Sequence, residues 1–381
     1  MYFSFKNQPS DFIVSEILPF ELSGNWDFFY IFFEKEKLNT MEIVLWICKN
    51  MKLKREQLGI AGLKDKEGIT KQRISISKKN LKICWGEQIF STFLKEKIKI
   101  LKSWRHDEPL AIGKNKGNQF EIRLRAKGKL PNELKTTLET KLEQQKTNSF
   151  PNAFWIQRFG KGNKNFKKAS KLFEKGLIDW KLNYEVKFKL QAFWSMRFNE
   201  LVMKRWNEQA FLLEGDIMVN RRNAFWTSVA NYFDNKLQHF DYWKLKEQSE
   251  NNSFLEAKEV LRTSDFKPEY RFPTGAVLGT EQLLCQKWTE ARKYDDRQIM
   301  TSWFEKFGNQ ISKTYKLYGF RRPLRTKARD LEWKREDRDL ILKFFLPTGS
   351  YASVFLSTLL EGIDPKGMIS NGLIIPLISQ A

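Results

Sequence analysis

The 381-residue sequence predicts an α+β fold with two kinds of region. Before about residue 145, several short segments alternate apolar and polar residues, as strands of a half-buried sheet do. After residue 150 the apolar residues take helical spacing, and strand-like residues return at Leu340–Phe345. A chain of this length exceeds what one core usually organises, so we expect two domains or one domain with a large insertion.

The first region opens with two predicted strands and a helix. An Asp-led turn leads into a strand within Pro9–Glu16, and Phe28–Glu34 is expected to be its antiparallel neighbour, with a turn at residues 23–25. Asn39 or Thr40 can cap a helix that runs to about Lys52. Further along we expect a strand at residues 72–77, a helix and then a strand within 81–104, a strand at 120–125 and a helix at 131–145.

A charged turn stands out between these elements. Lys64-Asp65-Lys66-Glu67 follows an apolar run broken by Gly59 and Gly62 and precedes the strand at residues 72–77. Asp65 therefore lies between two lysines on a loop held by ordered elements, which favours a catalytic loop. The alternative is a solvated mixed-charge turn.

The second region is predicted to be mainly helical, and we found no internal repeat or low-complexity linker in the chain. The expected helices and their interruptions are Phe166–Lys175, Phe188–Arg205, breaks at Arg221–Phe225 and Asp265–Phe272, a turn at Pro273–Gly275, a helix from Thr280 toward Arg297, another at Gln298–Phe307, and a last helix at Ser353–Glu361.

The charge points to a polyanionic partner. Sixty-seven Lys and Arg against 45 Asp and Glu give a net charge of +22, which favours nucleic acid or an anionic membrane. The 32 Phe, 13 Trp and 10 Tyr could supply base-stacking surfaces as well as core. The compositional bias of an AT-rich genome is the competing explanation for the lysines.

Cysteine and histidine usage excludes several classes of chemistry. Three cysteines far apart in sequence fit neither a disulfide framework nor a CxxC zinc site, which indicates a reducing, cytoplasmic setting. With His106 and His239 alone, we expect no metal and no Ser/His/Asp triad. No leader and no run of about 18 apolar residues is recognisable, so we expect no membrane association.

Nine segments spread over the whole chain form a recognisable series. They are Asp11–Glu16, Leu38–Thr40, Ala61–Lys66 with Thr70 and Gln72, Gly117–Phe120, Pro151–Asn152 with Gln157–Gly160, Ser195 with Phe198–Asn199, Gly215–Asp216, Pro273–Gly275 and Leu346–Ala352. Together, and in this order, they resemble the TruD family of tRNA pseudouridine synthases. Each segment alone is a weak signal. The chain departs from the family pattern at Ala153 and Trp155, where Tyr and Gly are usual.

The resemblance implies a pseudouridine-synthase catalytic fold with a central antiparallel or mixed sheet and an inserted, mostly α-helical domain specific to the family. The catalytic domain would comprise residues 1–148 and 326–381, and the insertion residues 149–325. It also implies a monomer that acts on tRNA without a cofactor, at the uridine of the D arm called position 13.

The chemistry of the reaction assigns roles to residues of the chain. Breaking the bond from N1 to the ribose and rejoining the base through C5 needs a carboxylate at the sugar–base junction, a role that Asp65 fits. A nearby Lys or Arg keeps such a carboxylate ionised by lowering its pKa. The resemblance implies Lys6 for this, while Lys64 and Lys66 are nearer in sequence.

The target base must leave its stack, so its pocket needs an aromatic face and a polar edge. The resemblance places Phe120 and Asn118 there, with Phe12 and Lys64 close by; an ordinary strand residue is the alternative for Phe120. Gln157, Arg158 and Phe159 would also contact substrate, or form a hinge into the insertion with Arg158 in a structural ion pair. RNA phosphates would be contacted by Lys114, Lys116, Lys161, Lys164, Arg221 and Arg222.

Two rival functions come from other classes. A non-catalytic RNA-binding or RNA-folding protein could keep the fold and the charge, although the intact Asp65 and its flanking lysines argue against lost activity. A metal-dependent nuclease would need clustered carboxylates in a recognisable spacing, and the sequence has none.

Overall fold

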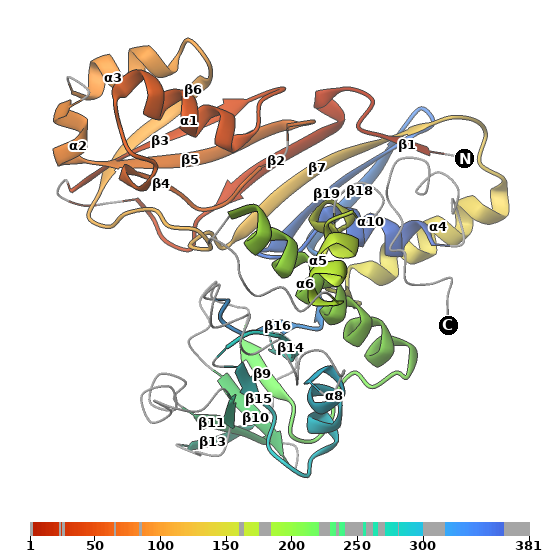
Figure 1. The fold of residues 1–381 in the computed structure, drawn as a ribbon. Coiled ribbons are helices and arrows are strands. Elements are labelled where there is room, and N and C mark those ends of the chain that lie inside the picture. Colours follow the sequence, from red (N-terminus) through yellow and green to blue (C-terminus); the bar gives the residue numbers. More distant parts are fainter. Residues whose placement is uncertain are drawn as a thin grey trace.

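The computed structural model describes residues 3–22, 24, 27–64, 66–83, 86–159, 164–174, 184–220, 229–233, 236–240, 254–256, 262–265, 271–280, 282–299 and 317–361. These residues form two bodies, each built on a sheet, with α5 (Lys164–Glu174) and α6 (Tyr184–Asn207) between them (Figure 1). The mixture of sheets and helices confirms the α+β fold class.

The first body contains a nine-stranded mixed sheet in the order β18-β19-β7-β2-β5-β3-β6, with β1 beside β7 and β4 beside β5. Among the described strands of this sheet, β2 and β5 are the one neighbouring pair that is parallel. Its strands are β1 (Phe3–Phe5), β2 (Phe12–Ile17), β3 (Phe28–Lys35), β4 (Leu58–Ile60), β5 (Ile69–Ser77), β6 (Lys99–His106), β7 (Gly117–Ala126), β18 (Arg329–Glu336) and β19 (Asp339–Pro347).

The predicted pairing of the first two long strands is wrong. Both strands exist, but β5 lies between β2 and β3, parallel to β2 and antiparallel to β3. Alternation shows that a segment has one buried face, yet it does not say which strand will be its neighbour. A pairing between segments more than 50 residues apart is therefore not visible in a local pattern.

Helices α1 (Thr40–Met51), α2 (Lys78–Ile83) and α3 (Glu87–Leu94) cover β3 and β5. The predicted cap of α1 is confirmed: the Asn39 side chain accepts from the Glu42 amide, and the Glu42 side chain accepts from the Asn39 amide. Ile43, Val44 and Ile47 face the core, where they pack on the strands. A short 3₁₀ helix, Arg55–Gln57, links α1 to β4.

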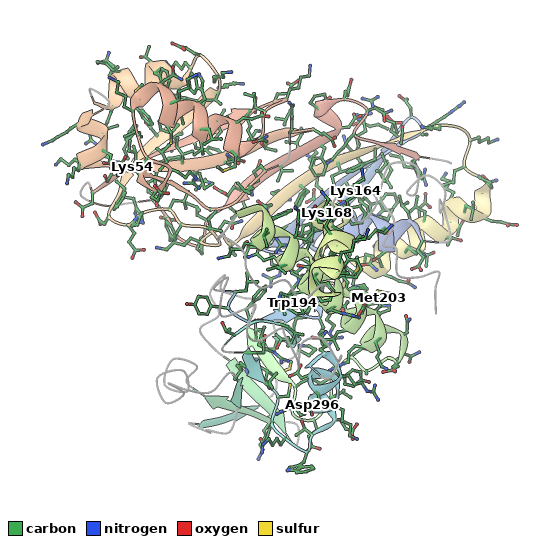
Figure 2. The ribbon with its side chains drawn as sticks, in the orientation of Figure 1. Lys54, Lys164, Lys168, Trp194, Met203 and Asp296 are labelled. Atoms are coloured by element: carbon green, nitrogen blue, oxygen red, sulfur yellow. The ribbon has the colours of Figure 1, made fainter. Side chains whose placement is uncertain are left out.

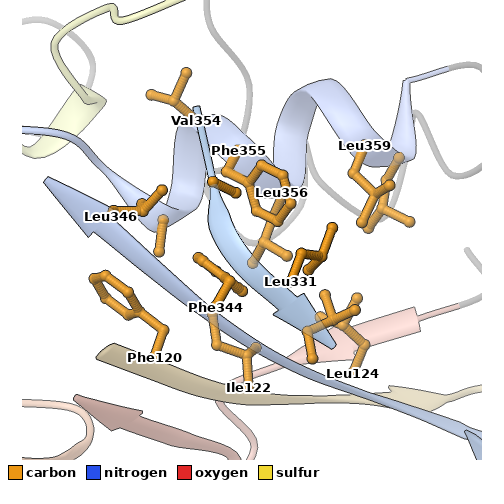
Figure 3. Close-up of a cluster of buried hydrophobic side chains, with 14 of the residues drawn as sticks. Phe120, Ile122, Leu124, Leu331, Phe344, Leu346, Val354, Phe355, Leu356 and Leu359 are labelled. Carbon is orange, nitrogen blue, oxygen red and sulfur yellow. The ribbon is translucent and has the colours of Figure 1, made fainter. Parts of the chain in front are cut away.

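Segments from distant parts of the chain meet on the other half of the sheet. Strand β19 pairs with β7 from Leu340 opposite Leu124 to Pro347 opposite Gly117. Helices α4 (Asn132–Gln145) and α10 (Ala352–Leu360) pack here, and Figure 3 shows α10 laid over strands that carry Phe120 and Phe344. This arrangement supports the proposal that residues 1–148 and 326–381 form one domain.

The second body contains a six-stranded antiparallel sheet in the order β13-β11-β10-β9-β14-β16. Between residues 149 and 325 the described α-helices are α5, α6 and α8 (Glu290–Ile299), so a mainly helical region was an incomplete prediction. The strands are β9 (Ile217–Asn220), β10 (Val229–Phe233), β11 (Lys236–Phe240), β13 (Arg262–Asp265), β14 (Arg271–Val277) and β16 (Phe320–Pro323), with the small pairs β12 (Phe254–Glu256) and β15 (Gln282–Leu284), and β8 (Phe150–Pro151) and β17 (Arg325–Thr326).

Two local predictions in this region are wrong. Pro273–Gly275 lies inside β14 and is not a turn. Gly275 has no side chain, so Leu201 can pack directly against the strand; a Cβ at Gly275 would lie 2.5 Å from Leu201 Cδ2. The helix expected from Thr280 begins only at Glu290, after β15. The predicted break at 221–225 lies outside the described residues, as does the predicted helix at 298–307 beyond Ile299.

Candidate active site

The predicted site residues fall in two places. Lys6, Phe12, Lys64, Asn118 and Phe120 lie together on β2, β7 and the segments that flank them, whereas Arg158 and Phe159 lie in the 3₁₀ helix Ile156–Phe159 of the second body. Asp65 lies outside the described residues, and so does the side chain of Gln157.

The pairing of β2 with β7 brings the first set together. Glu16 stands opposite Asn118 and Val14 opposite Phe120, so Asn118 and Phe120 project from the same face of β7. The ring of Phe120 lies 6.0 Å from that of Phe12 and stacks on that of Phe344 at 5.4 Å. Phe12 and Phe120 are both buried, which gives Phe120 the position of a core residue in this structure.

Lys64 is held by both its main chain and its side chain. Its amide donates to Thr40 Oγ1 at 2.8 Å, and its Nζ donates to Asn118 Oδ1 and lies 3.8 Å from Glu16 Oε1. Only 8% of the side chain is exposed. The residue before Asp65 is therefore fixed against β2 and β7.

Glu16 is a buried charge to which no role was assigned from the sequence. It accepts a hydrogen bond from the Arg73 amide at 3.1 Å and is 1% exposed. Burial raises the pKa of the Glu16 carboxyl, and the charges of Lys64 and Arg73 oppose this rise. The signal was in the sequence, because Glu16 is in phase with the buried Phe12 and Val14 on β2.

The surroundings of Lys64 contain buried polar atoms whose hydrogen bonding is incomplete. Thr40 Oγ1 donates to Gln72 Oε1 at 3.0 Å. Among the residues that the structure describes, Glu16 Oε1, Gln72 Nε2 and Thr70 Oγ1 have no hydrogen-bond partner. Unsatisfied buried polar atoms cost stability, and a catalytic or binding role is one reason for which a protein keeps them.

Lys6 reaches the same loop from the other side. Its Nζ lies 4.3 Å from the centre of the Phe12 ring and 3.6 Å from Glu67 Oε2, and 11% of its side chain is exposed. Gly68 lets the loop approach β2, because a Cβ there would lie 2.4 Å from the carbonyl oxygen of Phe12.

Lys66 differs from the other two candidate partners of Asp65. Its Nζ lies 3.8 Å from Glu42 Oε1, and 58% of the side chain is exposed. Of the three candidate partners, Lys6 and Lys64 are therefore the two that are largely buried.

Arg158 and Phe159 belong to the second body. Phe159 is buried in a core with Phe193 and Leu278, and Arg158 Nε donates to Ser195 Oγ at 3.2 Å. Arg158 also lines a cleft of about 270 Å³, whose other walls include Lys187, Gln191, Trp194, Tyr318 and Phe320. The structure therefore does not bring these two residues to Lys64 and Asn118.

The predicted phosphate contacts are described in part. Lys114 forms an ion pair of 3.0 Å with Glu108, and Lys116 is exposed. Lys164 lies on α5 with three more exposed lysines, Lys167, Lys168 and Lys171. Figure 2 labels Lys164 and Lys168 on this helix. None of the four has an ion pair with a described residue. Lys161, Arg221 and Arg222 lie outside the described residues.

Two kinds of feature are absent from the part of the chain that the structure describes. None of its helices has the length and apolar character needed to span a bilayer. The same residues contain no group of three or more His, Cys, Asp or Glu side chains placed to hold a metal ion.

Comparison with known sequences gives a consistent result over the whole chain. The family model described as "tRNA pseudouridine synthase D (TruD)" matches residues 2–178 and 186–359. Proteins named tRNA pseudouridine synthase D are 29% identical in Mannheimia succiniciproducens, over 92% of this chain and 92% of the relative, and 28% identical in Campylobacter jejuni, over 94% and 92%.

A solved structure has the same fold. It is titled as the putative tRNA pseudouridine synthase D (TruD) from Methanosarcina mazei, and it superposes with a TM-score of 0.55 at 18% sequence identity. The superposition covers 94% of each chain.

Proposed function

Because this chain belongs to the TruD family of tRNA pseudouridine synthases, we propose that it isomerises a uridine of tRNA to pseudouridine, and that its target is position 13 in the D arm. The observation that carries the proposal is the position of Lys64. The residue next to Asp65 is fixed on Asn118, and the largely buried Lys6 lies against the ring of Phe12.

Asp65 is the proposed nucleophile. Its carboxylate attacks C1′ of the ribose as the bond to N1 breaks, and the released uracil turns within the pocket. C5 then bonds to C1′ and displaces the carboxylate, and the C5 proton leaves while N1 gains one. Atoms balance without an oxidant, a metal or a cofactor.

Lys6 is the proposed partner of Asp65. Its Nζ contacts Glu67, two residues after Asp65, from a largely buried position. A cation held in such surroundings keeps a nearby carboxylate ionised. Lys64, occupied by Asn118 and Glu16, is assigned to orienting the pocket.

Asn118 is the proposed polar edge of the pocket. Since Lys64 Nζ donates to Asn118 Oδ1, the amide nitrogen Nδ2 is turned to donate to a carbonyl oxygen of the flipped uracil. Phe12 and Phe120 would contact the base after a small displacement of their rings, because both are buried as placed. The lysines of α5 and Lys116 would contact phosphates, which position RNA without reading its sequence.

The Asp65→Asn variant tests the proposal. An amide keeps the shape of the carboxylate but cannot form the covalent bond, so we expect no pseudouridine while the RNA dissociation constant stays within a few-fold. Mapping pseudouridine in a tRNA transcript after incubation measures product and position, with a transcript carrying cytidine at position 13 as the control.

Two results would count against the proposal. Substantial turnover by the Asn variant would remove Asp65 from its role. Binding without product by the wild-type protein, across tRNAs that carry uridine 13, would favour the alternative of a non-catalytic RNA-binding protein.

A further inference from the structure

Arg322, at the end of β16, is a buried cation without a carboxylate partner among the described residues. It is 6% exposed, and its Nε and Nη2 donate to the carbonyl oxygen of Asn152 at 3.1 and 3.0 Å. Its guanidinium lies 4.0 Å from the centre of the Phe154 ring. The neighbouring Arg321, equally buried, is instead paired with Asp295 at 2.5 Å.

The described residues give this cation aromatic faces and uncharged acceptors in place of a carboxylate. Burial lowers the pKa of Arg322 to about 10, and the charge of Arg158 acts in the same direction. The group is still a cation at neutral pH, although its hydrogen bonds to Asn152 go to uncharged acceptors. A buried charge without a counter-charge is costly, and an anion that binds there would remove the cost.

One donor of Arg322 is left for such an anion. Its Nη1 has no hydrogen-bond partner in the described part of the chain and lies beside the turn after β19, where a Cβ on Gly349 would be 3.5 Å from it. Gly349 has φ +76°, a conformation that glycine adopts without strain.

The amino end of α10 lies in the same turn. Tyr351 is its N-cap residue and makes no side-chain capping bond, and the Val354 amide donates to the Tyr351 carbonyl oxygen at 3.1 Å. The amides that lack an acceptor among the described residues are therefore those of Ala352 and Ser353. The amino end of a helix and a guanidinium both bind phosphate readily.

The turn is continuous with the candidate active site. Leu346 is paired with Asn118 across β19 and β7, and the Thr348 amide donates to the carbonyl oxygen of the exposed Lys116. Gly349 therefore lies three residues after Leu346, the residue of β19 that stands opposite Asn118.

We propose that Arg322, with the Gly349 turn and the amino end of α10, binds a phosphodiester of the substrate RNA next to the target nucleotide. The ligand is one phosphate group, taken from the RNA backbone. The identification of this RNA as a substrate rests on the proposed function. The phosphate site itself does not depend on that function.

The first test measures thermal unfolding in sodium phosphate and in sodium chloride at equal ionic strength, for the wild type and Arg322→Gln. Phosphate should raise the Tm of the wild type more than chloride does, and the difference should be lost in the variant. Arg338→Gln is the matched control, because Arg338 is exposed in the turn between β18 and β19, at the opposite end of β19 from Gly349.

The second test measures RNA binding against salt. The log–log slope of Arg322→Gln should be smaller than that of the wild type by one contact, roughly 0.7 to 0.9, and that of Arg338→Gln should be unchanged. A short D-arm RNA with single methylphosphonate linkages covers the case in which the Gln variant does not fold. Neutralising one linkage beside the target should weaken binding to the wild type roughly tenfold.

Each contrary result is decisive. Equal phosphate stabilisation of the wild type and Arg322→Gln would show that the anion binds elsewhere. Phosphate stabilisation specific to Arg322 with an unchanged RNA slope would assign the site to a free anion and overturn the RNA contact, and so would equal effects of all methylphosphonates. None of these measurements needs turnover, so failure of the isomerase proposal would leave them interpretable.

Discussion

Glu16 is a residue whose burial can be predicted from the sequence, although its role cannot. Its position in phase with Phe12 and Val14 places a carboxylate in the core of the sheet. Its two cationic neighbours, Lys64 and Arg73, come from segments about 50 residues away in sequence. No local pattern links these three residues, so the network that holds the candidate catalytic loop could be found only in the fold.

Because Glu16 is buried, the difference in stability between the wild type and the Glu16→Gln variant should depend on pH. A carboxyl whose pKa is raised in the fold contributes stability that is fully present below the usual Glu value of about 4.3 and is lost as the pH rises through the raised pKa. The stability of the wild type minus that of the variant should therefore fall as the pH increases above about 4.3. Urea unfolding of both proteins at several pH values measures this difference. A stability difference that stays constant or rises with pH would contradict a raised pKa for Glu16.

Helices whose ends and buried face can be recognised from neighbouring residues were predicted well. The Asn39 cap and the apolar spacing after it gave α1 to within a residue, and helices α4, α5 and α10 were placed about as closely. Short strands of the second body were missed because three to five residues carry too little alternation to be recognised. Pro273-Thr274-Gly275 has the composition of a turn, and tertiary packing makes it a strand.

The Gly275→Ala variant tests that explanation of β14. The added methyl group would meet Leu201 at 2.5 Å and Leu324 at 2.8 Å, so we expect a loss of about 1–3 kcal/mol in unfolding free energy. Gly128→Ala is the control, because a Cβ there meets nothing within 4 Å. Denaturant unfolding of the two variants should separate them, and equal stability would show that β14 tolerates the methyl group.

At the scale of the whole molecule, the net charge predicted a polyanionic partner but not where it binds. The exposed lysines of α5 supply a specific expectation, since none has an ion pair with a described residue. Figure 2 shows Lys164 and Lys168 on the helix between the two bodies and Lys54 far from them on the first body. Lysines scattered by genome composition alone would not differ in their effect on RNA binding.

The slope of the logarithm of the tRNA binding constant against the logarithm of the salt concentration should therefore be less steep in the Lys164→Ala/Lys168→Ala double variant, by roughly 1.4 to 1.8. The single-turnover rate at saturating RNA should change little, because phosphate contacts position the substrate. Lys49→Ala/Lys54→Ala, which removes two exposed charges from the far part of the first body, is expected to leave the slope unchanged. Equal slopes for the two double variants would favour the compositional explanation.

The pairing of β7 with β19 also has a consequence for synthesis on the ribosome. Strand β7 ends at Ala126 and its partner begins at Asp339, so more than 200 residues must be made before the edge of β7 is covered. At about 5–20 residues per second this takes roughly 10–40 s, during which the nascent chain exposes one unpaired edge of β7 and its apolar face, while β2 can already pair with the other edge. Vectorial folding of this protein is therefore expected to depend on chaperones that shield that strand until translation reaches the C-terminal segment.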